Sequence, residues 1–423
     1  MNFRRYTVLC ALACLAFAAA AQDLFDVAFK TGPADAILVS GDAALNIRRG
    51  DNGSRVARLP AGTHEVHILA GGYITKTVTV DVSGPGLLVE DKLERASSRL
   101  RLAAVMPTDR RPKSVEYTPD GKYLVVAPLS GSAVNILDAA TGALVASPAP
   151  PDKWAKAQGF VESAFPAGRN ELWVSQMYTD CIHVFSLSDF SYLRTLKCGG
   201  VFPKVILAHP DGRVFVSNWL SETVSVLDGE GTRLASLKAR SIPRGLALSA
   251  DGSILYVANF GDGTIEVFDA AGYERLDVWY DGSDGEPRGG AKRHLVLDKA
   301  AGRLYASDMA RGSVFVLDLA SGRHVAEIAV GPKANTIALS PDGTRLYVST
   351  RGPNNPVNYE IKGPVFGELA TIDTATLKVL DRQWGGNQPT GLAVSPDGTR
   401  VVITDFLDHR VELYDVFAGE SSH

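Results

Sequence analysis

The residues of this chain that could do chemistry are few and scattered. Two histidines stand three apart in "HEVH", at His64 and His67. Residues three apart on a strand point to opposite faces, so we do not expect this pair to bind one metal ion. The chain has no Gly-x-Ser-x-Gly elbow, phosphate-binding loop, Cys-x-x-Cys pair or haem attachment motif. The motifs therefore predict no bound cofactor and no set of catalytic residues.

One loop carries enough acid to suit a calcium ion. In "YDGSDGEPRGG" (280–290), Asp281, Asp284 and Glu286 lie close together along the chain, and Ca²⁺ takes oxygen ligands of this kind. Their spacing does not match that of an EF-hand loop, and acid-glycine loops are commonly solvated turns. We therefore predict no metal site and keep these three residues as a calcium candidate.

Two cysteines, Cys181 and Cys198, lie in "CIHVFSLSDFSYLRTLKC", symmetric about a turn at Asp189 and Phe190. Hairpin pairing about that turn would place them opposite each other. In an oxidising compartment this favours a cross-strand disulfide over a metal site, although the geometry of such a bridge is demanding. A pair of free thiols is the alternative.

The compartment is indicated by the first residues, "MNFRRYTVLCALACLAFAAAAQD". Two arginines, an apolar run and small residues predict a secretory signal peptide that is cleaved after Ala21. A lipoprotein anchored through Cys14 is disfavoured, because "ALAC" lacks the usual large apolar residue three places before the cysteine. No later segment has transmembrane length. We expect a soluble protein in the periplasm or at the cell surface.

The net charge argues against one class of partner. Removing the signal peptide removes Arg4 and Arg5 and no acid, so the formal net charge moves from -4 to -6. Nucleic-acid binding that is driven by net positive charge is therefore disfavoured.

Self-comparison shows seven repeat units. Each has an apolar strand, a tight turn with Asp-Gly or an equivalent pair, a second apolar strand, a loop, a third strand that ends near Asp, and a weaker fourth strand. Asp-Gly pairs supply the positive backbone angles of a tight hairpin, and strands that are apolar on both faces fit between neighbouring sheets. Four strands in roughly 40 to 50 residues, repeated seven times, predict an all-β, seven-bladed propeller. The units cover 114–142, 162–189, 205–231, 245–272, 294–322, 337–373 and 391–415.

The last unit has no fourth strand of its own. The segment "RLRLAAV" (99–105) has strand character and no other partner, so we predict that it closes the ring.

Three segments carry a family resemblance: "SADGSILYVANFGDGTIEVFDAAG" (249–272), "SPDGTRLYVST" (340–350) and "SPDGTRVVITD" (395–405). They resemble YVTN-type propeller repeats, as found in YncE-like extracytoplasmic proteins. The resemblance covers about 112–415 and implies the fold. It says little about activity, because the family includes binding proteins, domains attached to redox enzymes and lactonase-like relatives.

The N-terminal region differs from the repeats. Its segment "LPAGTHEVHILAGGYITKTVTVDV" (59–82) resembles a PEGA-type small β-domain, which implies an accessory module of cell-envelope proteins. The predicted organisation is a signal peptide over 1–21, a small β-sandwich-like domain over 22–95, the propeller over 97–416 and a tail over 417–423.

The long connections of the repeats all belong to one face of the predicted propeller. Loops between strands two and three, and between blades, emerge on the same face. The three long connections, 147–161, 280–293 and 351–367, are all of these kinds, whereas every loop between strands one and two is a tight turn. Binding sites favour loops that a rigid scaffold holds, so we expect this loop-bearing face to carry the site.

The repeat register indicates which side chains point into this face. The position just before the first strand of successive blades holds Lys113, Glu162, Lys204, Arg244, Arg293, Asn335 and Thr390. The end of the second strand holds Pro128, Gln176, Asn218, Asn259, Asp308, Thr350 and Asp405. The next position holds Leu129, Met177, Trp219, Phe260, Met309, Arg351 and Phe406.

These positions predict a locally positive funnel with aromatic walls, which suits an anionic or sugar-containing ligand or a peptide. The alternative is that the Asn and Asp residues only end their strands, while the aromatic residues plug the ring between blades. The predicted ligand-binding set is Lys113, Glu162, Lys204, Trp219, Arg244, Phe260, Arg293, Asn335, Asp308, Arg351, Asp405 and Phe406.

The sequence favours a non-enzymatic binding or scaffold protein of the cell envelope. It would recognise a protein partner, peptide, glycan or small anionic ligand on the loop-bearing face, without a cofactor. The alternative is a lactonase-like propeller hydrolase or lyase that holds a small carboxylate or lactone with the same charged residues. An assembly factor for a redox system and single-stranded DNA binding are further alternatives.

Overall fold

The structure is a computed structural model, and it describes residues 23–32, 34, 36–40, 43–70, 73, 76–93, 99–280, 289–363 and 366–417. The predicted signal peptide with Cys14 and the calcium candidate Asp281, Asp284 and Glu286 lie outside these residues. In the described ranges, no helix is long and apolar enough to cross a membrane.

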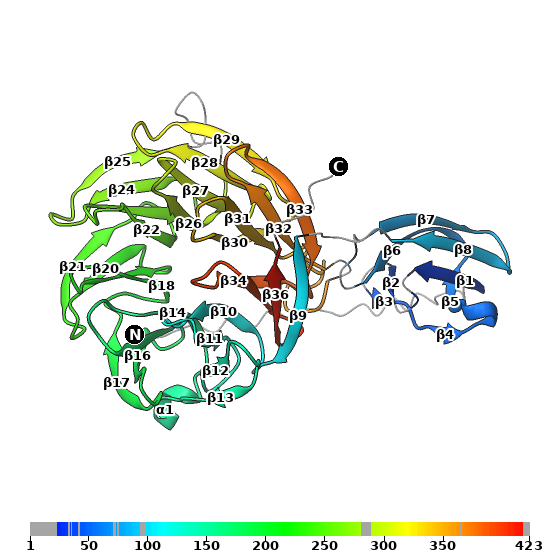
Figure 1. Cartoon of the computed structure of the whole chain (residues 1–423), viewed down its shortest axis with the longest axis horizontal. Helices are drawn as coiled ribbons and strands as arrows, with labels where there is room; N and C mark the ends of the chain where they lie inside the picture. Colours follow the sequence, from blue (N-terminus) through cyan, green and yellow to red (C-terminus); the bar gives the residue numbers. More distant parts are fainter. Residues whose placement is uncertain are drawn as a thin grey trace, which may run out of the picture.

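Seven four-stranded antiparallel sheets are arranged around a common centre, as Figure 1 shows. We number them blade 1 to blade 7 in chain order of their inner strands. The inner strands are β10 (Pro112–Tyr117), β14 (Phe160–Ala164), β18 (Pro203–Ala208), β22 (Pro243–Leu248), β26 (Lys292–Asp298), β30 (Ala334–Leu339) and β34 (Pro389–Val394). The second strands are β11 (Tyr123–Pro128), β15 (Glu171–Gln176), β19 (Val214–Asn218), β23 (Ile254–Asn259), β27 (Arg303–Asp308), β31 (Arg345–Thr350) and β35 (Arg400–Asp405).

The outermost strand of each blade is more exposed than the other three. The third strands are β12 (Asn135–Asp138), β16 (Cys181–Ser186), β20 (Thr223–Leu227), β24 (Ile265–Asp269), β28 (Ser313–Asp318), β32 (Glu368–Asp373) and β36 (Arg410–Val416). The outer strands are β13 (Leu144–Ala146), β17 (Tyr192–Lys197), β21 (Arg233–Lys238), β25 (Arg275–Trp279), β29 (His324–Ala329), β33 (Lys378–Trp384) and β9 (Leu100–Pro107). One short helix, α1 (Asp152–Ala155), lies in the connection between blades 1 and 2.

The outer strand of blade 7 comes from the start of the propeller region. Strand β9 pairs antiparallel with β36, from Pro107 opposite Arg410 to Leu100 opposite Val416. Figure 1 shows the two strands side by side, β9 in cyan and β36 in dark red. The predicted fold, seven four-stranded blades in a propeller, is confirmed.

The hydrophobic core of the propeller lies between blades. The second strands are buried along almost their whole length, which their apolar character on both faces predicts. Val125 and Ala127 of blade 1, for example, belong to one buried cluster with Phe160, Leu172 and Val174 of blade 2. Burial of apolar area is the main stabilising term in folding, so each blade depends on its two neighbours.

The N-terminal domain is a small β-sandwich, as predicted. One sheet has the order β4 (Arg48–Arg49), β5 (Arg55–Pro60), β1 (Leu24–Gly32) and β8 (Leu87–Lys92). The other has the order β3 (Ala43–Ala44), β2 (Ile37–Ser40), β6 (Gly62–Leu69) and β7 (Lys76–Val82), and a 3-10 turn spans Asp51–Gly53. Buried residues of both sheets, among them Phe29, Leu38 and Ile68, form one shared core.

The two cysteines do not form the candidate disulfide. Cys181 and Cys198 are free, buried thiols. Cys181 lies opposite Lys197 because the hairpin register differs by one residue from the pairing that the sequence symmetry predicts, and an irregularity at Val184 and Phe185 accompanies this shift. Each thiol instead lies 3.1 Å from a backbone carbonyl oxygen. This hairpin therefore carries two free thiols, which is the alternative named above.

Buried hydroxyl groups fasten neighbouring blades to each other. In blade 3, Ser217 Oγ accepts a hydrogen bond from the backbone N–H of Val205 at 3.1 Å and donates to the carbonyl oxygen of Arg244 in blade 4 at 2.8 Å. Three other blades repeat both bonds, and blade 7 repeats the bond within the blade. The hydroxyl residues are Ser175, Ser217, Ser307, Ser349 and Thr404, each one place before the end of its second strand.

Removing one of these hydroxyls should destabilise the propeller. In Ser217→Ala, the N–H of Val205 and the carbonyl of Arg244 lose a buried partner, and the free energy of unfolding should fall by about 1–3 kcal/mol. Denaturant titration of the full chain measures this change. The control is Ser236→Ala, which removes an exposed hydroxyl from β21 and should change the free energy by less than about 0.5 kcal/mol. Equal effects of the two substitutions would contradict the inter-blade role of Ser217.

Candidate functional site

Each inner strand carries a register irregularity near its start. In blade 4 it falls between Pro243 and Leu246, and the other six blades show one at the corresponding place. A bulge leaves residues out of the hydrogen-bonded ladder and re-aims their side chains. The residues that the sequence placed just before each inner strand lie inside these bulges. Most of them are the second residue of the strand. The sequence pattern predicted a later start for the inner strands, because the bulge interrupts the alternation of inward-facing and outward-facing side chains.

A left-handed backbone conformation precedes the bulge in most blades. The residue two places before the ring position has a positive φ in five of them: Arg111 (62°), Phe202 (65°), Ile242 (47°), Lys333 (61°) and Gln388 (59°). This conformation is rare for bulky or β-branched side chains, and each instance costs on the order of 1–3 kcal/mol. Its repetition beside the ring shows that the fold maintains this backbone path at a cost.

The basic ring is the set of basic side chains that these bulges and the first residue after β31 bring together. Its members are Lys113, Lys204, Arg244, Arg293 and Arg351. They come from blades 1, 3, 4, 5 and 6, and the charge of one member affects the protonation of another across the centre of the propeller. Arg244, Arg293 and Lys204 are almost fully buried, whereas Lys113 keeps part of its surface open to solvent.

Glu162 is the carboxylate that faces this ring. Its Oε1 atom lies 3.3 Å from Nη2 of Arg244, and the salt bridge joins blade 2 to blade 4 past blade 3. Such a contact is possible only where the inner strands converge. Arg293 Nε donates a hydrogen bond to Oδ1 of Asn335 in the next blade. The structure therefore brings Glu162 and Asn335 together with the basic ring.

Burial and mutual repulsion shift the protonation of the ring. The pKa of Lys204 is lowered to about 6 by burial and by the nearby Arg244 and Arg293. The pKa of Lys113 is also lowered well below its usual value, first by burial and then by Arg293 and Arg351. Arginine keeps its charge under these conditions, so at neutral pH the arginines carry most of the positive charge.

A second carboxyl group lies near the ring. Glu116 follows Lys113 on β10, and its pKa is raised to about 8 by burial and by the charge of Glu162. It therefore holds its proton at neutral pH and does not neutralise the arginines. The repeat register did not single out Glu116, although an acid inside the apolar strand "SVEY" is a signal that could have pointed to it.

Aromatic side chains pack against the basic groups, at the positions where the sequence places the aromatic walls of the funnel. Trp219 and Phe260 contact each other with ring centroids 4.9 Å apart, and Lys204 Nζ lies 4.8 Å from the centroid of Trp219. Phe406 lies against two basic side chains, with Lys113 Nζ at 5.1 Å and Arg351 Cζ at 5.8 Å from its centroid. Cations at these distances are attracted by the ring faces.

The long insertion of blade 6 is anchored and supplies a member of the ring. Arg351 Nη2 donates to Oε1 of Gln388, whose Nε2 donates in turn to the carbonyl oxygen of Tyr359 at 2.6 Å. Glu360 forms a 3.1 Å salt bridge with Arg111 of blade 1. The described part of this loop thus contacts blades 7 and 1 and holds Arg351 over the centre.

Two residues of the predicted ligand-binding set do not reach the ring. Asp308 accepts hydrogen bonds from Lys292 Nζ at 2.8 Å, from the N–H of Ala291 just before β26 and from the N–H of Ala310 just after its own strand. Asp405 accepts from Arg410 Nε at 2.9 Å and from the N–H of Gly386 at 3.0 Å. Both carboxylates are fully buried inside their blades. At these two positions the alternative interpretation applies: the acidic residue ends its strand and does not line the ring.

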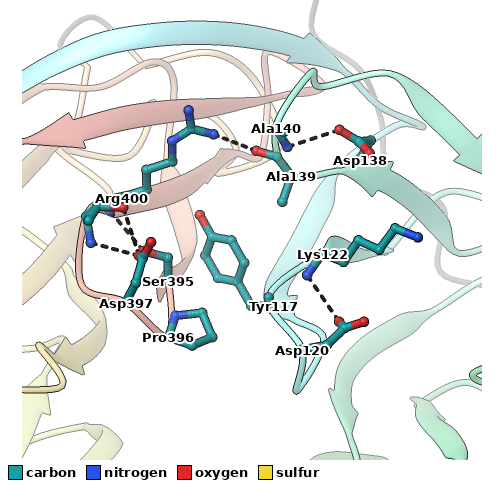
Figure 2. A pocket seen from close by; sticks show the side chains of 12 residues that line it. Tyr117, Asp120, Lys122, Asp138, Ala139, Ala140, Ser395, Pro396, Asp397 and Arg400 are labelled. Atoms are coloured by element: carbon teal, nitrogen blue, oxygen red, sulfur yellow. Dashed lines mark hydrogen bonds between the residues drawn. The ribbon is translucent and has the colours of Figure 1, made fainter.

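The opposite face of the propeller has a groove of about 440 Å³ between blades 7 and 1 (Figure 2). It is lined by the tight turns of these blades, with Tyr117 and Arg400 at its centre. The carboxylates of Asp120, Asp138 and Asp397 each accept hydrogen bonds from the backbone of their own turn. These groups are engaged in holding the turns, so the groove offers less to a ligand than the basic ring does. Over the described ranges, no cluster of His, Cys, Asp and Glu could hold a metal ion.

Known proteins resemble this chain over most of its length. It is 40% identical to antigen Lp49 of Leptospira interrogans serogroup Icterohaemorrhagiae serovar copenhageni over 333 residues, which cover 76% of this chain and 71% of that protein. It is 27% identical to proteins named YncE from Salmonella typhimurium and Salmonella typhi over 185 residues, 42% of this chain and 46% of each relative. The chain belongs to the YncE-like propeller family.

A solved structure supports the fold of this YncE-like propeller. Hydrazine synthase of Kuenenia stuttgartiensis matches with a TM-score of 0.53 and 25% identity, over 60% of this chain and 76% of that chain. No family model matches the sequence. The PEGA-like character of the N-terminal domain therefore stays a prediction.

The buried lysine of the ring should make the stability of this YncE-like propeller depend on pH. Because the pKa of Lys204 falls from its usual 10.5 to about 6 on folding, the unfolded chain binds more protons in that window. The lysine therefore destabilises the folded state increasingly as pH falls from 10.5 to 6. Lys204→Met, which keeps the apolar contacts with Trp219, should raise the free energy of unfolding by about 1–4 kcal/mol near pH 6. The gain should shrink as pH approaches 10.

Denaturant titrations of wild type and Lys204→Met at several pH values measure this effect. The matched control is Lys238→Met on the outer strand β21, where the lysine side chain is 68% exposed. We expect the control to show no comparable gain at pH 6. A Lys204→Met protein that is less stable than wild type at every pH would contradict the prediction.

Proposed function

We propose that this YncE-like propeller is an exported binding protein that takes an acidic segment of a protein partner into the basic ring. One observation carries the proposal: among the described residues, three buried arginines converge and a single salt bridge, from Arg244 to Glu162, offsets their charge. Arg244 pairs with Glu162, whereas Arg293 and Arg351 form no salt bridge among the described residues. Burying an unpaired cation costs several kcal/mol, and an anionic group of a ligand would supply the missing counter-charge.

The surroundings of the ring support a peptide or protein rather than a free ion alone. Large apolar side chains are exposed on the loops of this face, and the greatest exposed fractions are 81% for Val357 and 61% for Leu220. Apolar and aromatic residues around a charged centre are typical of protein interfaces. The exposed residues of this apolar rim are Tyr178, Val201, Leu220, Val357, Tyr359 and Ile361.

The family relationship supports the proposed location. The relative that covers most of this chain is called an antigen, which fits an exported or surface protein. The N-terminal residues, whose sequence predicts a signal peptide, point the same way. We therefore place the proposed partner in the cell envelope.

The geometry favours binding over the lactonase-like alternative. A hydrolase or lyase built on this ring would need several carboxylates that converge with the basic side chains. Asp308 and Asp405 lie inside their blades, and Glu162 is paired with Arg244.

Acidic peptides should bind the full chain through the ring. We expect a fluorescently labelled hexaglutamate peptide to bind wild type, more weakly at 200 mM than at 50 mM salt, and hexalysine not to bind. Arg293→Gln should weaken hexaglutamate binding at least about tenfold, which corresponds to about 1.4 kcal/mol. Fluorescence anisotropy measures both affinities.

The matched control is Arg323→Gln, which removes an exposed arginine from a turn of the opposite face. It should bind like wild type, and circular dichroism should show that both variants are folded. The proposed function is wrong if hexaglutamate does not bind wild type. It is also wrong if hexaglutamate binds Arg293→Gln as well as it binds Arg323→Gln.

A further inference from the structure

Within the part of the chain that the structure describes, three buried hydrogen-bond donors at the edge of the basic ring have no partner. They are Nη2 of Arg293, Nδ2 of Asn335 and Nε of Arg351. Buried polar groups in folded proteins almost always have a partner, and leaving one unpaired costs about 1–3 kcal/mol. The three residues belong to the neighbouring blades 5 and 6. Arg293 Nε donates to Oδ1 of Asn335, which holds their two free donors close to each other.

We propose that Arg293, Asn335 and Arg351 form a seat for one compact oxyanion group, a carboxylate or a phosphate. This oxyanion seat rests on the proposed function and names the chemical group of the partner that enters the ring. It adds to that function a defined position between blades 5 and 6 and a donor set. Lys113 faces the seat from blade 1, because the charges of Arg293 and Arg351 both act on its ammonium group.

The chemistry of the seat selects an ionised oxyanion over other polar groups. A guanidinium has only donors, and the single acceptor of the Asn335 side chain is already used by Arg293. A hydroxyl or amide ligand would bring a proton of its own, which none of these three donors can accept. A carboxylate or phosphate only accepts, and it matches the planar fork of an arginine.

The seat is held in place before any ligand arrives. Arg351 is fixed by its hydrogen bond to Gln388. The carbonyl of Asn335 accepts the inter-blade hydrogen bond of Ser307, and the carbonyl of Arg293 accepts one from Arg244 Nη1 at 3.4 Å. Side chains and backbone that are already ordered lose little entropy on binding, which favours affinity for a small group.

Binding in the seat should be accompanied by proton uptake. Burial and the surrounding cations lower the pKa of Lys113, and an anion placed between Lys113 and the arginines would reverse part of this effect. The groups that share this environment are Glu116 on the same strand, Glu162 on β14, Lys204 on β18, Arg244 on β22, Arg293 on β26 and Arg351 after β31. Of these, Glu116 holds a proton at neutral pH and so adds no charge that would oppose the anion.

Titration calorimetry of the full chain with inorganic phosphate and with succinate tests the seat. At pH 7 in HEPES and in Tris buffer, we expect at least one of the two probes to bind once per chain. The apparent enthalpy should differ between the buffers by the ionisation enthalpy of the protons taken up. Binding of phosphate alone assigns the seat to phosphoryl groups, binding of succinate alone assigns it to carboxylates, and binding of both supports the shared chemistry.

The decisive variant is Asn335→Asp. Its carboxylate would accept from Arg293 and fill the seat from within, so probe binding should fall at least about tenfold while the midpoint of thermal unfolding rises. A variant that merely misfolds would lose binding and stability together. Lys113→Met should retain probe binding in weakened form and lose the buffer dependence of the enthalpy. Arg323→Gln on the opposite face is again the control and should match wild type.

The outcomes separate the seat from the proposed function. If neither probe binds, or Asn335→Asp binds a probe like wild type, the seat does not exist. If hexaglutamate still binds in an Arg293-dependent way in that case, the basic ring recognises acidic partners without a fixed seat. If hexaglutamate also fails to bind, both proposals fall.

Discussion

The bulge at the start of every inner strand is the constraint on which the centre of this propeller depends. Regular pairing would turn the second residue of each strand into the space between blades, where the core is apolar. The bulge releases that residue from the ladder, and in five blades a left-handed residue before it directs the chain into this path. The hydroxyl of the preceding blade then binds the carbonyl of the released residue, as Ser217 does for Arg244. Blade packing and the position of the ring are therefore set by the same few contacts.

This arrangement stores an electrostatic cost at the centre. Among the described residues, three arginines and two lysines meet the salt-bridged carboxylate of Glu162, and the second carboxyl, Glu116, keeps its proton at neutral pH. The lysines can lower this cost by releasing protons, as the pKa of Lys204 shows, but the arginines cannot. Aromatic faces and the Glu162 salt bridge compensate only part of the repulsion. A core selected for stability alone would hold apolar side chains here, and buried charges of this kind mark a candidate binding site, in line with the proposed function.

The sequence predicted the architecture because the repeat encodes it seven times. The apolar second strands and their tight turns end at the expected residues, Asn218 and Asp308 among them. The sequence pointed to the residues of the basic ring but not to the side-chain directions at the strand ends. The sequence of a single strand looks the same whether its pairing is bulged or regular. Asp308 therefore entered the predicted site, although Lys292 holds it inside blade 5. The bridging hydroxyls were readable in the aligned repeats, where a Ser or Thr recurs one place before the strand end.

The insertion of blade 6 explains why the ring is asymmetric. At the position after the second strand, the other six blades carry apolar residues that cover the centre, whereas blade 6 carries Arg351. An arginine at that place needs a partner to hold it, and the long loop supplies one, because the carbonyl of Tyr359 orients Gln388 toward it. The same loop exposes Val357 and Ile361 at the rim. A single insertion thus adds a charge to the centre and apolar surface around it, which is the combination that an acidic segment of a protein partner would contact.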